Sequence, residues 1–172
     1  KKLFQLLNKT ATEVCEGQQY DLDFEKDDKL VLNDYIEMIR LKTAVLLGCS
    51  LKMGALIGEA NQEDCELLNL FGIEIGIAFQ LQDDYLDIFG DPKIFGKKTG
   101  GDVVKNKKTI LYHLVLKKGK THHKKKIKEI LSKDFEADNI SDKISEVSKI
   151  YIESGAKDKT RGMIKDYAGS AY

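Results

Sequence analysis

Tryptophan is absent from this 172-residue sequence, proline occurs once, and none of the three cysteines forms a Cys-x-x-Cys pair. Widely spaced cysteines in odd number suggest neither a disulfide framework nor a zinc site. We therefore expect reduced thiols in a cytoplasmic protein. The scarcity of proline, together with many leucine, isoleucine, lysine and glutamate residues, favours helices.

Charge of one sign is not in excess, because 28 basic residues balance 28 acidic ones. Such a chain has no overall attraction for nucleic acid or for an anionic membrane. Its apolar runs are interrupted by charged residues before they reach the roughly 20 residues of a membrane span, so we expect no stable membrane insertion. The one basic run, residues 117–128, carries Ile127 in register with Ile130 and Leu131 and is interpreted as a solvent-facing helix side rather than a nucleic-acid site.

Helical periodicity runs through most of the chain. The predicted helices span residues 2–16, about 33–59, 62–89, 109–118, 121–132, 141–154 and 157–168. Gly17 is expected to end the first of them, with a turn after it, and Asn33 or Asp34 to cap the second. These elements predict an all-α fold, an antiparallel helical bundle.

The helix expected at 62–89 has Asn61 as its N-cap and ends before Gly90. Its apolar residues occupy nearly the whole circumference, which predicts a central helix surrounded by others. Gly72 and Gly76 are one turn apart and indicate a close approach by another helix.

The segment FQLQDDYLD, residues 79–87, places four polar side chains on one face of that helix: Gln80, Asp83, Asp84 and Asp87. Three neighbouring carboxylates repel one another, and the C-terminal end of a helix also disfavours negative charge. A divalent cation would compensate, and oxygen ligands without histidine or cysteine suit Mg²⁺. The alternative is a solvated acidic helix end.

Positive charge lies on both sides of this segment in the sequence. Residues 91–108 are rich in glycine and lysine, a composition that can bind phosphate through backbone N–H groups and ammonium groups. Lys42 and Thr43 precede the apolar run at 44–50, where a charge is costly to bury. Lys42 either extends to solvent or meets an anion in a cleft.

Four segments, in this order, resemble the trans-isoprenyl diphosphate synthases, or polyprenyl synthetases: GQQYDLDFE, the Lys42-Thr43 pair, FQLQDDYLDIFGDP and GKKTGGDVVKNKKTIL. The resemblance covers nearly the whole chain. It implies that residues 1–172 are the C-terminal part of a single isoprenoid synthase domain. The family's first aspartate-rich motif and the paired arginines after it belong to the N-terminal half and are absent here.

The resemblance also implies roles for particular residues. The metal ligands would be Asp83, Asp84 and Asp87, holding Mg²⁺ against the diphosphate of the allylic substrate. The catalytic residues would be Lys42, Thr43 and Gln80. Diphosphate would be bound by Lys42, Gln80, Lys97 and Lys107, with Lys98 in place of Lys97 if the loop is shifted by one residue. Gln18 and Asp21 match a Gly-Gln-x-x-Asp motif.

The implied activity is the condensation of an allylic diphosphate with isopentenyl diphosphate, by a homodimer in the cytoplasm. We expect residues 1–172 alone to lack this activity, because half of the site belongs to the missing motifs. Alternatives are a non-catalytic helical subunit of a heteromeric prenyl diphosphate synthase, a terpene cyclase of related fold and a structural metal-binding bundle.

Overall fold

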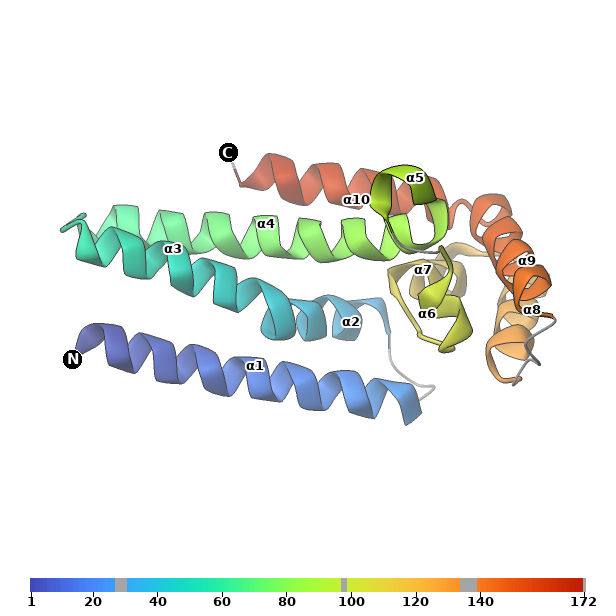
Figure 1. The fold of residues 1–172 in the computed structure, drawn as a ribbon, viewed down its shortest axis with the longest axis horizontal. Helices are drawn as coiled ribbons and strands as arrows, with labels where there is room; N and C mark the ends of the chain where they lie inside the picture. The colour runs from blue at the N-terminus through green and yellow to red at the C-terminus, as the bar shows by residue number, and fades with distance from the viewer. Residues whose placement is uncertain (27–30, 97–98, 134–138, 172) are drawn as a thin grey trace. The chain divides into compact units, whose positions relative to one another are not determined.

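The computed structural model describes residues 1–26, 31–96, 99–133 and 139–171 (Figure 1). Within these ranges the regular structure is helical and contains no strand, as predicted. The elements are α1 (Lys2–Lys26), α2 (Leu32–Ile39), the π-helical turn η1 (Arg40–Ala44), α3 (Val45–Ile57), α4 (Gln62–Phe89), α5 (Pro92–Phe95), α6 (Gly101–Val104), α7 (Ile110–Lys118), α8 (Thr121–Leu131), α9 (Ile140–Glu153) and α10 (Ala156–Ser170).

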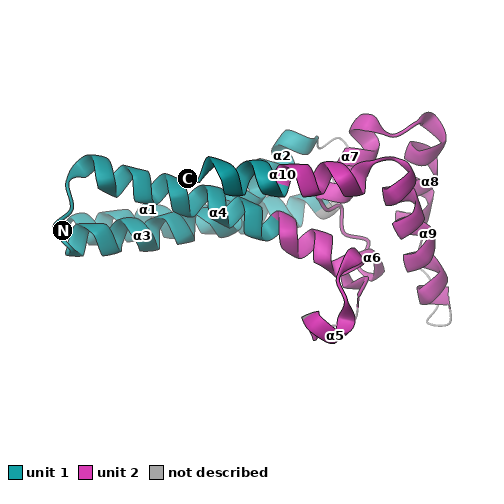
Figure 2. Cartoon of the chain, turned by 90° about the horizontal axis from the view of Figure 1, so that it is seen from above, with its two compact units in different colours: residues 1–80, 164–172 teal, residues 81–163 magenta. Residues whose placement is uncertain are grey.

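The chain forms two compact units, coloured separately in Figure 2. Unit 1 contains residues 1–80 and 164–172, and unit 2 contains residues 81–163. Helices α1 to α3 and the first part of α4 belong to unit 1. The last turns of α4, with α5 to α9, belong to unit 2.

Unit 1 is an antiparallel arrangement in which α1 packs on η1 and α3, and α3 packs on α4 (Figure 1). Small residues bring α3 and α4 into close contact. A Cβ added to Gly72 would lie 2.6 Å from the Gly48 Cα, and one added to Gly76 would lie 2.5 Å from the Ala44 Cα. The close approach predicted at Gly72 and Gly76 is therefore confirmed.

Gly17 does not end the first helix, and this prediction is wrong. Helix α1 continues to Lys26, so the GQQYDLDFE segment is helical rather than a turn. A Cβ on Gly17 would overlap the Lys42 backbone nitrogen and would lie 2.7 Å from the Leu41 carbonyl carbon. Glycine is needed there for the approach of α1 to η1, and not for a helix stop.

The second predicted helix is divided. It begins as α2 at Leu32, and Asp34 lies in the first turn, where its carboxylate accepts the Val31 N–H at 2.8 Å. The expectation that Asn33 or Asp34 is the N-cap is thus wrong by two or three residues. A π-helical turn then separates α2 from α3. Such turns are frequent at functional sites.

Helix α4 begins and ends where the sequence predicts. The Asn61 side chain accepts the Asp64 N–H at 2.9 Å, and the helix ends at Phe89. However, the prediction of an all-round buried helix is wrong for this chain. Leu67, Leu70 and Phe79 are each more than half exposed, because nothing in the described part of the chain covers that side of α4.

Unit 2 has its own core, built mainly on α7. Its buried side chains include Ile110, Leu111, Leu114, Val115, Ile127, Val147 and Tyr151. The basic run forms most of α8 with Ile127 buried and Lys125 exposed, which confirms the interpretation as a solvent-facing helix side. None of the helices in the described ranges is both long enough and apolar enough to cross a membrane.

Candidate functional site

In unit 1, Lys42 lies on the π-helical turn and meets a carboxylate from another helix. Its ammonium donates to the Asp21 carboxylate at 2.6 Å, and both side chains are about one-third exposed or less. The sequence left two alternatives for Lys42, extension to solvent or contact with an anion. The structure shows an anionic partner, the Asp21 carboxylate of α1. The long α1 matters here, because a turn after Gly17 would not deliver Asp21 to this position.

Thr43, the neighbour of Lys42, is bonded to Gln80. The Thr43 hydroxyl donates to the Gln80 side-chain oxygen at 3.2 Å. This hydrogen bond fixes which way the amide of Gln80 points. Unit 1 thus brings together the three side chains predicted as catalytic in two adjacent polar pairs, Lys42 with Asp21 and Thr43 with Gln80.

In unit 2, Asp84 is almost completely buried, with 4% of its surface exposed. Its carboxylate accepts the backbone N–H of Ile110, the first residue of α7, at 3.4 Å. The first N–H groups of a helix have no partner within the helix and carry partial positive charge. The start of α7 therefore stabilises the Asp84 carboxylate.

Asp87 is held in a similar way by the start of α6. Its carboxylate accepts the Asp102 N–H at 3.0 Å and the Gly101 N–H. A Cβ on Gly101 would lie 3.3 Å from the carboxylate, so the absence of a side chain lets the backbone close on Asp87. Burial raises the pKa of Asp87 above its ordinary value, and the charges of Asp102 and Asp83 add to this, whereas the two N–H donors oppose it.

Asp83 is partly exposed and comes from the same turn of α4. In the part of the chain that the structure describes, no three histidine, cysteine or acidic side chains converge on one point as a ready-made metal site. A cation here would use one or two carboxylates and fill its remaining positions with water or substrate oxygens. Mg²⁺ is usually bound in this way, so the residues fit that ion.

The lysines of the predicted phosphate loop are only partly described. Lys107 extends toward Asp102, 3.4 Å between the charged atoms. The predicted diphosphate ligand Lys97, and Lys98 as its alternative, lie outside the described residues. Lys107 keeps more than a third of its side chain exposed while paired, so an anionic ligand could reach it.

Three residues near the carboxylates were not identified from the sequence: Asp102, Thr109 and Tyr151. Asp102 follows Gly100-Gly101 directly, and an acidic residue in a lysine-rich loop was a usable signal. Tyr151 had no such signal, because only tertiary structure brings α9 to α4. Its phenol is buried and bonded to the Thr109 side chain, and burial raises its pKa, with the nearby Asp84 charge adding to the effect.

The sequence profile of the polyprenyl synthetase family matches residues 1–148. The chain belongs to the polyprenyl synthetase family. A geranylgeranyl diphosphate synthase from Methanosarcina mazei is 42% identical over 118 residues, which are 69% of this chain and 36% of that protein.

Solved structures agree with this membership in the polyprenyl synthetases. A crystal structure of a geranylgeranyl pyrophosphate synthase has a TM-score of 0.93 at 41% identity and covers 99% of this chain and 52% of its own. A Corynebacterium glutamicum geranylgeranyl pyrophosphate synthase, crystallised with isoprenyl diphosphate and magnesium, has a TM-score of 0.86 at 28% identity, over 98% of this chain and 47% of that one. The chain spans about half the length of these polyprenyl synthetases.

Proposed function

We propose that this chain is part of a trans-isoprenyl diphosphate synthase that condenses an allylic diphosphate with isopentenyl diphosphate, giving geranyl, farnesyl or geranylgeranyl-type products. The observation that carries the proposal is the support of two carboxylates at the end of α4. Asp84 and Asp87 each accept N–H groups from the first residues of another helix. A solvated acidic helix end would not need such support.

The reaction requires stabilisation of a departing diphosphate. Breaking the allylic C–O bond leaves a carbocation and an anion of several charges, and fixed positive groups in a site that excludes water lower the barrier for this step. The sequence motifs shared with the polyprenyl synthetases support Lys42, Lys97 and Lys107 as proposed diphosphate ligands. Mg²⁺ ions would each be held by one or two of the carboxylates of Asp83, Asp84 and Asp87 and would neutralise charge on the leaving diphosphate.

The carbocation needs a different environment. The Thr43 hydroxyl is turned toward Gln80, so the oxygen of Thr43 presents a lone pair while its hydrogen is occupied. Oxygen dipoles of this kind are proposed to stabilise positive charge on the allylic carbon. The double bond of isopentenyl diphosphate then attacks that carbon and forms the new C–C bond. The isopentenyl unit, which now carries the positive charge, loses a proton to the released diphosphate.

The assembly is proposed to be a cytoplasmic homodimer. Because the sequence has no first aspartate-rich motif, we expect residues 1–172 to contribute the part of the site described above and to show no prenyl transfer alone. Turnover of dimethylallyl and isopentenyl diphosphate by this chain alone, followed by chromatography of the products, would contradict that expectation.

Titration calorimetry tests the proposed ligand chemistry. Mg²⁺ is added to the protein with and without inorganic diphosphate, and diphosphate is added with and without Mg²⁺. We expect each to bind much more tightly when the other is present, and Asp83→Asn to remove this dependence. Asp166→Asn is the control, since Asp166 is an exposed carboxylate on α10. Mg²⁺ binding of equal strength with and without diphosphate would instead support a structural metal site, and no binding of either would favour a non-catalytic subunit.

A further inference from the structure

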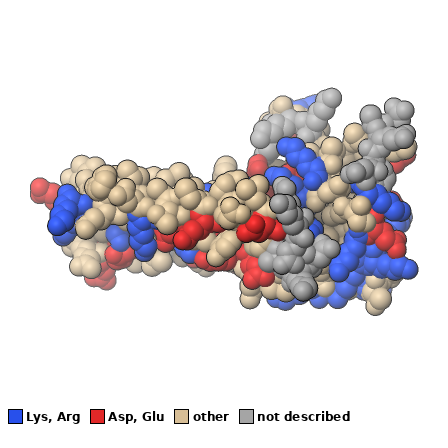
Figure 3. Space-filling view, turned by 90° about the horizontal axis from the view of Figure 1, so that it is seen from below, with Lys and Arg blue, Asp and Glu red and all other residues tan. Residues whose placement is uncertain are grey.

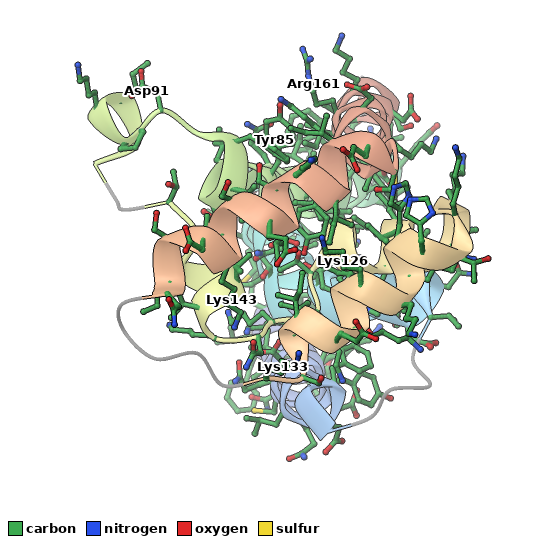
Figure 4. The ribbon with its side chains drawn as sticks, turned by 90° about the vertical axis from the view of Figure 1, so that its right-hand side faces the viewer. Tyr85, Asp91, Lys126, Lys133, Lys143 and Arg161 are labelled. Atoms are coloured by element: carbon green, nitrogen blue, oxygen red, sulfur yellow. The ribbon has the colours of Figure 1, made fainter. Side chains whose placement is uncertain are left out.

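Lys143 is a buried cation that the proposed function leaves without a role. It lies on α9, marked in Figure 4, with only 2% of its surface exposed. Its ammonium donates to the side-chain oxygen of Asn106 at 2.5 Å. Lysine is almost never fully buried unless it is paired, and Asn106 supplies one such partner for the ammonium.

Asn106 lies at a turn that depends on its conformation. Its φ is +56°, in the left-handed region, which asparagine tolerates better than most residues. The turn follows α6, with the Asn106 N–H donating to the Val103 carbonyl and the Lys107 N–H donating to the Asp102 carbonyl. Lys107, a proposed diphosphate ligand, is the next residue. The Lys143 ammonium therefore anchors the turn that sets the direction of Lys107.

The residue after Lys143 anchors the other end of the same segment. A Cβ on Gly100 would lie 2.5 Å from the Ile144 side chain, and Gly100 itself has a φ of +85°. Two consecutive residues of α9 thus hold the two ends of this segment. Lys143 donates a charged hydrogen bond to Asn106, and Ile144 packs closely on Gly100. Between these two points lie the N–H groups of Gly101 and Asp102 that bind Asp87.

We propose that Lys143 is a positioning residue of the diphosphate and metal site. By holding Asn106, Lys143 fixes the position of residues 100–110. The N–H groups of this segment then support Asp84 and Asp87, and Lys107 is presented to an anion. The effect of Lys143 on the two carboxylates follows from the geometry alone, whereas the effect of Lys143 on ligand binding rests on the proposed function.

Amide hydrogen exchange tests the geometric part. Lys143→Met keeps most of the aliphatic stem and removes the ammonium. We expect exchange at the Asp102 and Ile110 amides to become about tenfold faster, in keeping with the loss of one charge-assisted hydrogen bond. The control is Lys149→Met, which removes an ammonium from the same helix at a side chain that is 74% exposed. Unchanged exchange at both amides in Lys143→Met would overturn the proposal.

Calorimetry with Mg²⁺ and inorganic diphosphate tests the functional part, at a temperature well below the unfolding midpoint of every variant. Asn106→Gly keeps the left-handed turn but removes the acceptor, and Asn106→Asp keeps an acceptor. We expect Lys143→Met and Asn106→Gly each to weaken Mg²⁺ binding about tenfold, the double variant to be no worse than either, and Asn106→Asp to bind as the unsubstituted protein does.

A lower unfolding midpoint with unchanged Mg²⁺ affinity would show that Lys143 is only structural and would overturn the proposal. Additive losses in the double variant would also contradict it. If the unsubstituted protein binds no Mg²⁺ with diphosphate, the proposed function fails, and amide exchange alone then decides the geometric part. If Lys143→Met does not fold, exchange in Asn106→Gly decides it, because glycine takes the left-handed conformation without strain.

Discussion

At the scale of single residues, Lys42 is held by the carboxylate of Asp21, which is not one of the proposed metal ligands. Replacement by methionine removes the ammonium and keeps the apolar stem. Because the proposed charge-assisted hydrogen bond to phosphate oxygen would then be lost, we expect Lys42→Met to weaken binding of inorganic diphosphate, in the presence of Mg²⁺, by about tenfold or more. Lys9→Met is the matched control, with the same change of charge at a side chain that is 75% exposed and lies 3.9 Å from the Glu13 carboxylate. Equal affinities of the two variants in calorimetry would contradict this role for Lys42.

A second residue-scale prediction concerns Glu37, which accepts two hydrogen bonds of 2.7 Å from Arg40. These hydrogen bonds lower the pKa of Glu37 from its ordinary value of 4.5, against a smaller opposing effect of burial. The stabilisation is therefore fully present above about pH 4.5 and is lost as the pH falls through the lower pKa of the folded state. Since Glu37 is half-exposed, this stabilisation contributes only about 0.5 kcal/mol to the free energy of unfolding.

The measurement is urea unfolding of Glu37→Gln and of the unsubstituted protein between pH 3 and 7. The two free energies of unfolding should differ at neutral pH and approach each other toward pH 3. A difference that stays the same across this range would show that the carboxylate charge is not the cause.

At the scale of elements, the contact of α1 with η1 depends on Gly17. A methyl group there would meet the backbone of Leu41 and Lys42, which cannot move aside as a flexible side chain can. We expect Gly17→Ala to lower the free energy of unfolding by roughly 1–2 kcal/mol, since overpacking outweighs the better helix propensity of alanine. Because η1 carries Lys42, binding of diphosphate should weaken as well.

Gly162→Ala is the matched control for Gly17→Ala. Gly162 is inside α10 and has no neighbouring atom within 4 Å of an added Cβ, so alanine should raise the free energy of unfolding by about 0.5–1 kcal/mol. Thermal unfolding of both variants gives the comparison, and the same sign of change in both would contradict the packing role of Gly17.

Elements differ in how well the sequence predicted them. Helix α4 was predicted at both ends, because Asn61 and Gly90 act locally and leave a strong signal. Gly17 was misinterpreted because a glycine that permits a close tertiary contact looks the same in sequence as one that ends a helix. The π-helical turn at Lys42 has no pattern of its own. The carboxylates of the candidate site were recognisable from their spacing, but their N–H donors were not, since every residue except proline has one and only folding brings α6 and α7 to α4.

At the scale of the whole molecule, the net charge is zero, and the face seen in Figure 3 carries both basic and acidic side chains. A diphosphate is therefore not attracted by the protein as a whole and must be bound by local groups. The candidate site, however, also contains the carboxylates of Asp83, Asp84 and Asp87, which repel a diphosphate. This opposition is why the proposed site requires a cation and a diphosphate together.

The same opposition gives a prediction for the stability of the whole chain. A ligand that binds only the folded state stabilises it by about 2.7 kcal/mol at a hundred times its dissociation constant. For a chain of this size that raises the unfolding midpoint by roughly 5–10 °C. We expect this rise when Mg²⁺ and inorganic diphosphate are both present, little change with either alone, and reversal by a chelator. Thermal unfolding followed by circular dichroism is the measurement, with Asp83→Asn expected to abolish the rise and Asp166→Asn to retain it. An equal rise with Mg²⁺ alone would mean that the carboxylates form a self-sufficient metal site, because a diphosphate would then contribute nothing to holding the ion.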